Sequence, residues 1–158
     1  MPTVRLSFSP APAHVRTARL VAVAVARRAG VADALLEEIR LAIGEACSRA
    51  VALHRSQGTD SLIDMAMDNG DRFTVRVVDR AVEGPATTAA TSDPAAFLVD
   101  DAPAVEVPET LAEEAVAARM GLALLAGLVD DLRVSAVPGG SGTEVSMSWP
   151  VTRRPADA

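Results

Sequence analysis

The stretch Leu36–Val51 constrains the fold more than any other part of the chain, because its apolar residues recur at the spacing of an α-helix. With Asp33 as its cap, this helix is predicted to run from residue 33 to about residue 54. Its apolar face is lined by Leu35, Ile39, Ala42 or Ile43, Ala46 and Ala50. A helix with one apolar face must pack on a second layer, which the rest of the chain has to supply.

Strand patterns supply that layer. In order, the chain predicts a strand at 3–8, helices at 13–29 and 33–54, strands at 61–68 and 72–79, a helix at 109–130, and strands at 131–137 and 143–149. Gly30 is expected to end the first helix, and Asp68–Asp71 is expected to form a hairpin turn. Hairpin-joined strands with helices on one face indicate an α+β two-layer sandwich with a mixed, mainly antiparallel sheet.

The 158 residues are predicted to form one domain over 1–151, followed by a disordered tail at 152–158. Residues 84–108 are rich in proline, acids and small residues, which is typical of a lid, a binding loop or a disordered segment. Apolar residues make up 49% of the chain but aromatic residues only 3%, so we expect a core of Ala, Val and Leu. The net charge of −6, without a basic stripe, argues against direct nucleic-acid binding.

A cytoplasmic location is expected. The chain opens directly into a strand pattern without the features of a signal peptide, and the apolar stretch Leu20–Ala26 is too short to cross a membrane. The single cysteine, Cys47, has no partner for an internal disulfide and is predicted to be a buried small apolar residue. No metal site is predicted.

Four short motifs follow one another along the chain: Glu45–Val51 with His54 after it, Asp79–Gly84, Arg119–Leu125, and Gly142–Thr143. Together they resemble the motifs of the GHKL (Bergerat-fold) ATPases. Within that group the chain is most similar to the RsbW/SpoIIAB type of anti-sigma factor and serine kinase. The resemblance covers about residues 3–150 and implies the histidine-kinase-like ATPase fold, with ATP and Mg²⁺ as possible cofactors.

In the first motif, the resemblance implies that Glu45 occupies the position of the catalytic base and that residue 49 should be an asparagine that ligates Mg²⁺. Arg49 stands there instead, and a guanidinium has no acceptor atom to offer a cation. We expect Glu45 and Arg49, one helical turn apart, to form a structural ion pair. The alternative is that Arg49 contacts phosphate directly. On either interpretation Glu45 is expected to be inactive as a base.

The other motifs are altered too. Asp79 stands at the adenine-binding position, or is an ordinary strand-end aspartate that makes a turn, and Ala81 replaces the first glycine of its motif. Gly121 keeps the second glycine of a phosphate-binding turn while Arg119 replaces the first, although Gly121 could simply let this helix pack closely on the sheet. Thr143 keeps a hydroxyl that would help to hold Asp79. The implied nucleotide-binding residues are Arg49, Asp79, Arg119, Gly121 and Thr143.

The motifs for metal binding, base catalysis and phosphate binding are altered together. The resemblance therefore implies an anti-sigma factor with weak or lost kinase activity. It would sequester an RNA polymerase sigma factor and be released by a STAS-domain anti-anti-sigma partner, with contacts at Arg16 and Arg19. The alternative is an active serine kinase that phosphorylates the STAS partner with ATP. A third possibility is a sensor domain that binds another ligand. A homodimer is also implied, with Val4, Leu6 and Phe8 as candidate contacts, although core packing is their more common use.

Overall fold

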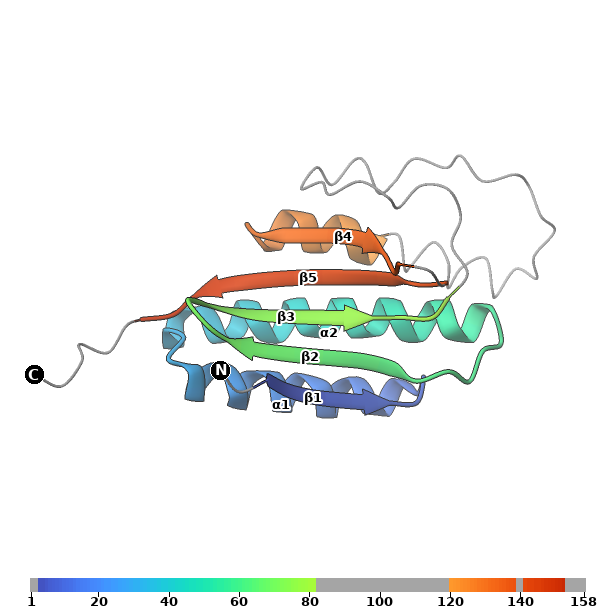
Figure 1. The fold of residues 1–158 in the computed structure, drawn as a ribbon, viewed down its shortest axis with the longest axis horizontal. Coiled ribbons are helices and arrows are strands. Elements are labelled where there is room, and N and C mark those ends of the chain that lie inside the picture. Colours follow the sequence, from blue (N-terminus) through green and yellow to red (C-terminus); the bar gives the residue numbers. More distant parts are fainter. Residues whose placement is uncertain (1–2, 82–119, 139–140, 153–158) are drawn as a thin grey trace, which may run out of the picture.

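The computed structural model describes residues 3–81, 120–138 and 141–152, which form one antiparallel sheet with helices on one face (Figure 1). The elements are β1 (Thr3–Phe8), α1 (Pro12–Ala29), α2 (Asp33–Ser56), β2 (Ile63–Asn69), β3 (Arg72–Val78), β4 (Leu132–Ala136) and β5 (Thr143–Pro150). Residues 120–128 are also helical. The predicted α+β two-layer architecture is confirmed, and all pairs of neighbouring strands are antiparallel.

The sheet has the strand order β1-β2-β3-β5-β4, so the last strand in the chain lies between β3 and β4. The register aligns Met67 with Val75 and Val75 with Met147, which places one apolar row across the sheet. Because side chains alternate between faces along a strand, this row points to one side only. In Figure 1, α1, α2 and the helix at 120–128 all lie behind that side.

The two long helices begin and end for identifiable reasons. Pro12 opens α1, where a missing N–H costs nothing. Gly30 ends it in a left-handed conformation (φ 91°), as predicted, and its N–H returns to Ala26 and Arg27. The prediction that Asp33 caps α2 is wrong: Ala32 is the cap, and Asp33 lies inside the first turn. There its charge favours the positive end of the helix dipole without a capping hydrogen bond.

Packing resolves the open choices along the helices. On α1, Val21 packs on the core while Leu20 is 59% exposed, and on α2 both Ala42 and Ile43 are buried. The expectation of a core of Ala, Val and Leu is wrong in one respect. The largest fully buried side chains are Phe73, Ile39, Ile43, Ile63, Met65, Met67, Leu125 and Met147. The helices α1 and α2 supply the buried alanines, while the bulk between the layers comes from the strands together with Ile39, Ile43 and Leu125 of the helices.

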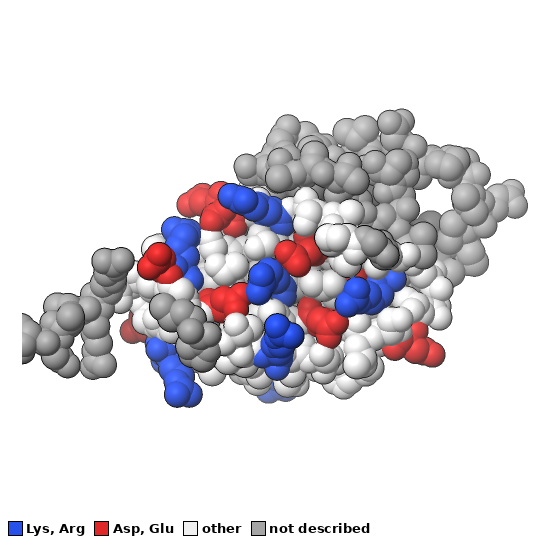
Figure 2. Space-filling model, viewed as in Figure 1, with Lys and Arg blue, Asp and Glu red and all other residues white. Residues whose placement is uncertain are grey.

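The opposite face of the sheet is polar. There Arg76 pairs with Asp68, and Arg80 lies 3.6 Å from Asp64. Basic and acidic side chains are interspersed over this face (Figure 2). An alternation of buried apolar and exposed paired polar residues is what an antiparallel sheet covered on one side requires.

Several predictions fall partly or wholly outside the described residues: the loop at 84–108, the start of the helix at 109–130, and the tail from 153. The hairpin turn between β2 and β3 is confirmed, with the N–H of Gly70 bonded to the carbonyl oxygen of Arg72. In the described part of the chain, no helix combines the length and apolar character needed to cross a membrane.

Candidate functional site

Asp79 is the polar residue that the fold places most unusually. It directly follows β3 and has the same parity as Phe73, Val75 and Val77, so its side chain points to the helical layer rather than to solvent. Only 1% of it is exposed. Its backbone N–H donates to the carbonyl oxygen of Thr143 at 3.0 Å, which extends the β3–β5 pairing by one residue. A carboxylate in this position needs a partner of opposite charge.

Arg49 of α2 is that partner. Its Nη1 donates to Asp79 Oδ2 at 2.9 Å, and the two side chains are only 5% and 1% exposed. The expected ion pair between Glu45 and Arg49 is therefore wrong. A pair one turn apart on a helix surface contributes only a few tenths of a kcal/mol, whereas an unpaired buried carboxylate costs far more. The guanidinium consequently reaches across to the sheet.

The second oxygen of Asp79 is also engaged. Oδ1 accepts the backbone N–H of Ala81 at 3.0 Å, which is an Asx turn at the end of the strand. The turn-making alternative for Asp79 is thus present, and the adenine-binding alternative stays a prediction. Ala81 is buried and has a negative φ, so the chain here does not use the left-handed conformation that a glycine would permit.

Gly142 brings the β5 side of the site close to Asp79. Its φ is +129°, and a Cβ added there would lie 2.0 Å from the carbonyl oxygen of Asp79. The next residue, Thr143, is fully buried, and its Oγ1 has no hydrogen-bond partner within the described residues. The main-chain oxygen of Thr143 therefore holds Asp79, whereas the hydroxyl of Thr143 takes no part in this contact.

His54 is a site residue that sequence reasoning noted without giving it a role. It is fully buried, its Nδ1 lies 3.0 Å from the carbonyl oxygen of Ser61, and its Nε2 accepts the backbone N–H of Arg80 at 2.8 Å. These partners require a neutral ring protonated on Nδ1. Arg49 and His54 together fasten α2 to residues 79–80. A lone histidine in an otherwise apolar helical stretch was the available signal.

The helix at 120–128 approaches the same place. Gly121 has a helical conformation, and a Cβ added to it would lie 3.7 Å from Arg49 Cβ and 3.6 Å from Glu45 Oε2. Close packing therefore occurs, against α2 rather than against the sheet. The structure brings Glu45, Arg49, Asp79, Gly121 and Thr143 together, while Arg119 lies outside the described residues.

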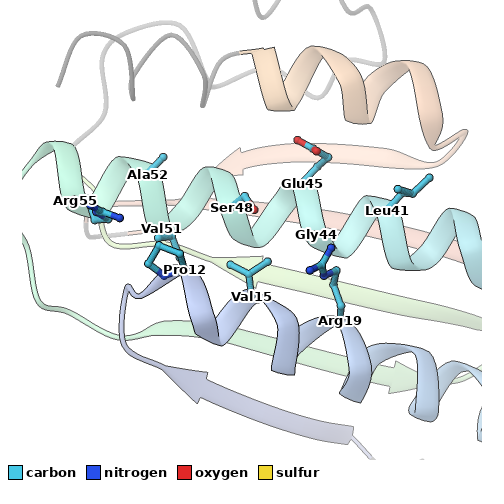
Figure 3. A pocket seen from close by; sticks show the side chains of 10 residues that line it. All are labelled: Pro12, Val15, Arg19, Leu41, Gly44, Glu45, Ser48, Val51, Ala52 and Arg55. Atoms are coloured by element: carbon cyan, nitrogen blue, oxygen red, sulfur yellow. The ribbon is translucent and has the colours of Figure 1, made fainter. Parts of the chain in front are cut away.

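The two predicted partner-binding arginines lie apart from this cluster, on α1. Arg16 is exposed, and Arg19 packs over Gly44, where an added Cβ would lie 3.0 Å from Arg19 Cδ. Arg19 lines a groove of about 340 Å³ between α1 and α2, together with Val15, Leu41 and Glu45 (Figure 3).

Cys47, on α2, is buried, as predicted. Burial raises the pKa of its thiol from the ordinary 9.0 to about 12, and the positive charge of Arg19 opposes that rise in part. The thiol is therefore protonated at neutral pH and unsuited to nucleophilic or metal-binding chemistry.

The described residues do not fit a Mg²⁺–nucleotide in the way that the resemblance implies. Arg49 offers donors and a positive charge where a metal needs an acceptor. Both oxygens of Asp79 already accept hydrogen bonds. Among residues 3–81, 120–138 and 141–152, no group of three or more His, Cys, Asp or Glu residues is placed to hold a metal ion. Among the buried side-chain polar atoms of the described residues, the hydroxyl of Thr143 has no hydrogen-bond partner.

Comparison with known proteins assigns the family. No curated protein gives a significant match to the chain. A family model described as "Histidine kinase-like ATPase domain" matches residues 8–149, from the end of β1 to the end of β5. That span includes both helices of the groove and every described residue of the buried cluster. The chain belongs to the histidine kinase-like ATPase domain family.

Proposed function

We propose that this protein is a regulatory binding protein of the RsbW/SpoIIAB anti-sigma type, in which phosphoryl transfer is weak or lost. The observation that carries the proposal is the buried ion pair of Arg49 and Asp79. Phosphoryl transfer depends mostly on positioning and on neutralisation of phosphate charge by Mg²⁺. A site whose metal position is filled by a cation, and whose aspartate is committed to that cation, lacks both requirements.

Partner binding would use the outer surface of the helical layer. The groove between α1 and α2 combines charged side chains, Arg19 and Glu45, with an apolar rim in which Leu41 is 56% exposed. Arg16 is exposed on the same helix as Arg19. A surface that combines charged side chains with exposed apolar ones is suited to a protein partner. We assign it to a sigma factor, with a STAS-domain protein as the competitor that releases the sigma factor in the cytoplasm.

Homodimerisation remains part of the proposal. Of the three β1 side chains considered for such a contact, Phe8 belongs to the core, Leu6 is partly buried, and Val4 is 38% exposed. The available surface is therefore the outer part of β1. Sedimentation of the purified protein, with Val4→Arg as the comparison, measures the oligomeric state directly.

One observation favours the alternative, an active serine kinase that acts on a STAS-domain protein. Glu45 is retained at the base position. Arg49 pairs with Asp79 and therefore does not neutralise Glu45. Since Glu45 is only partly buried, it could still face a hydroxyl group brought by a substrate.

Two assays on purified components separate these functions. In the first, the protein is mixed with candidate sigma factors and STAS proteins from the same cell, and complexes are measured by calorimetry. We expect binding that Arg19→Glu weakens at least tenfold, while Arg28→Glu, a control at the other end of α1, leaves it unchanged. In the second, radiolabelled ATP and Mg²⁺ are added with the STAS protein. Stoichiometric labelling of that protein would establish the kinase instead, and absence of any complex would reject the anti-sigma role.

A further inference from the structure

We propose that Arg49 is a built-in ligand of the ancestral nucleotide site. Its guanidinium takes the donor position on Asp79 that a bound molecule would otherwise use, and holds the site closed without nucleotide or metal. Removal of the side chain then converts Asp79 into a receptor for a small guanidinium-type cation. The inference rests on the proposed loss of kinase chemistry, but not on the identity of any protein partner.

The geometry of the pair supports this role. The Arg49 side chain begins beside Gly121, crosses from α2 to the sheet, and ends in a charge-assisted hydrogen bond to Asp79 Oδ2 at 2.9 Å. The arginine is 6% exposed and the aspartate 1%. The arginine therefore fills the space between the two layers with its stem and satisfies the acceptor with its head, as a bound ligand would.

The surroundings of Asp79 look like a receptor rather than ordinary core. Its backbone is fixed by Thr143, and its Oδ1 by the N–H of Ala81, so that only Oδ2 faces Arg49. The register pairs Val78 with Glu144, which places Thr143 across from Asp79 with its side chain on the same face. The fully buried Thr143 Oγ1 has no partner among the described residues. Buried polar atoms are rarely left unpaired, so this hydroxyl is available for one more polar contact.

Charge explains why a nucleotide would not displace the arginine. A ligand amino group that bound Asp79 would have to break a charge-assisted hydrogen bond and leave the Arg49 guanidinium without its partner inside the protein. Phosphate could attract the guanidinium only by drawing it away from the aspartate. The internal pair is therefore favoured over both parts of a Mg²⁺–nucleotide.

The test measures thermal unfolding by the fluorescence of Trp149, the only tryptophan in a chain without tyrosine. For the unaltered protein, 1 mM ATP with or without Mg²⁺ should leave Tm unchanged. For Arg49→Ala, millimolar N-ethylguanidinium should raise Tm by about 3–6 °C, the range for a ligand near tenfold its Kd in a domain of this size. N-ethylurea, a neutral molecule of the same shape, should not. Arg40→Ala, at an exposed position on the same helix, should respond to neither.

Three results would overturn the inference: stabilisation of the unaltered protein by ATP and Mg²⁺, equal responses of Arg49→Ala and Arg40→Ala to ethylguanidinium, or equal effects of ethylguanidinium and ethylurea. If Arg49→Ala does not fold alone, it is refolded with ethylguanidinium or ethylurea, and recovery of folded protein only with the cation supports the inference. Failure of sigma-factor binding would reject the partner assignment and leave these results standing. Nucleotide binding by the unaltered protein would reject this inference even if the partner assignment held.

Discussion

At the scale of single residues, the site depends on one long side chain that satisfies a carboxylate on the core side of the sheet. Asp79 points inward because it continues the alternation of β3, and Arg49 reaches it from α2. A buried ion pair adds little net stability, because both charges lose hydration on folding. Loss of one partner is different, since the other charge then stays buried without compensation.

Arg49→Ala should therefore lower the free energy of unfolding by about 3–5 kcal/mol, and Asp79→Ala should have a comparable effect. The double variant should lose less than the sum of the two, because no unpaired charge remains. Urea denaturation followed by Trp149 fluorescence measures all three. The control is Arg40→Ala, whose partner Glu37 is exposed and 3.7 Å away, and it should change stability by less than about 0.5 kcal/mol. Simple additivity would contradict a direct interaction.

Two glycines with opposite surroundings provide a comparison. Gly142 has φ +129° and no room for a Cβ, which would lie 2.0 Å from the carbonyl oxygen of Asp79. Gly142→Ala should prevent stable folding or destabilise the protein by more than about 3 kcal/mol, since both strain and overlap oppose it. Gly127, in the helix at 120–128, has nothing within 4 Å, so Gly127→Ala should stabilise the protein by up to about 1 kcal/mol. Thermal unfolding of both variants checks this, and similar Tm values would contradict it.

At the scale of secondary-structure elements, α2 organises the domain. One face packs on the sheet, and Arg49 and His54 bond to the residues after β3. At Gly44, the side chain of Arg19 from α1 packs directly on the helix. Trp149 of β5 also donates its indole N–H to Glu38 of this helix at 3.0 Å. A single helix thus couples the buried site on one side to the groove on the other.

Gly44→Ala tests the groove side of α2. The new methyl group would lie 3.0 Å from Arg19 Cδ, the flexible part of a long side chain that can move away. Stability should rise by up to about 1 kcal/mol, because alanine is the better helix former. Binding of the proposed partner should weaken, because Arg19 is displaced. Calorimetry and urea denaturation of the same preparation separate the two effects, and unchanged binding would show that Arg19 is not positioned by Gly44.

At the scale of the whole molecule, the composition allows the titration of one buried group, the Cys47 thiol, to be measured separately. Apart from two histidines, all basic side chains in this chain are arginine, and it contains neither lysine nor tyrosine. Cys47 is consequently the one side chain expected to titrate between about pH 9 and pH 12. Its pKa is raised to about 12 by burial, so the folded protein keeps the proton after the unfolded chain has lost it.

Unfolding in that window releases a proton, and rising pH therefore favours the unfolded state. The free energy of unfolding should fall by up to about 1.4 kcal/mol per pH unit above pH 9. Below pH 9 the thiol is protonated in both states, so its contribution to stability is fully present. Cys47→Ala should show a flat profile over the same range. Urea denaturation of both proteins between pH 8 and about pH 10.5 measures the difference. Parallel profiles would mean that the thiol ionises freely in the folded protein.

The elements were largely predictable because they depend on local patterns. The helical spacing of Ile39 and Ala46, the alternation in β3 and the glycine after α1 act over a few residues and are read directly from the chain. The site was less predictable. The structure places the motif positions close together, namely Glu45, Arg49, Asp79, Gly121 and Thr143, but the predicted partner of Arg49 was wrong.

The sequence by itself determined the order of the elements, the apolar face of α2 and the family, because periodicity and motif spacing are properties of the chain. Only the tertiary structure decided that Arg49 pairs with Asp79, that His54 joins Ser61 to Arg80, and that the Thr143 hydroxyl has no hydrogen-bond partner among the described residues. The reason is physical. The choice of a partner for a buried charge is made by burial and by the distance between layers, and neither exists until helix and sheet have packed together.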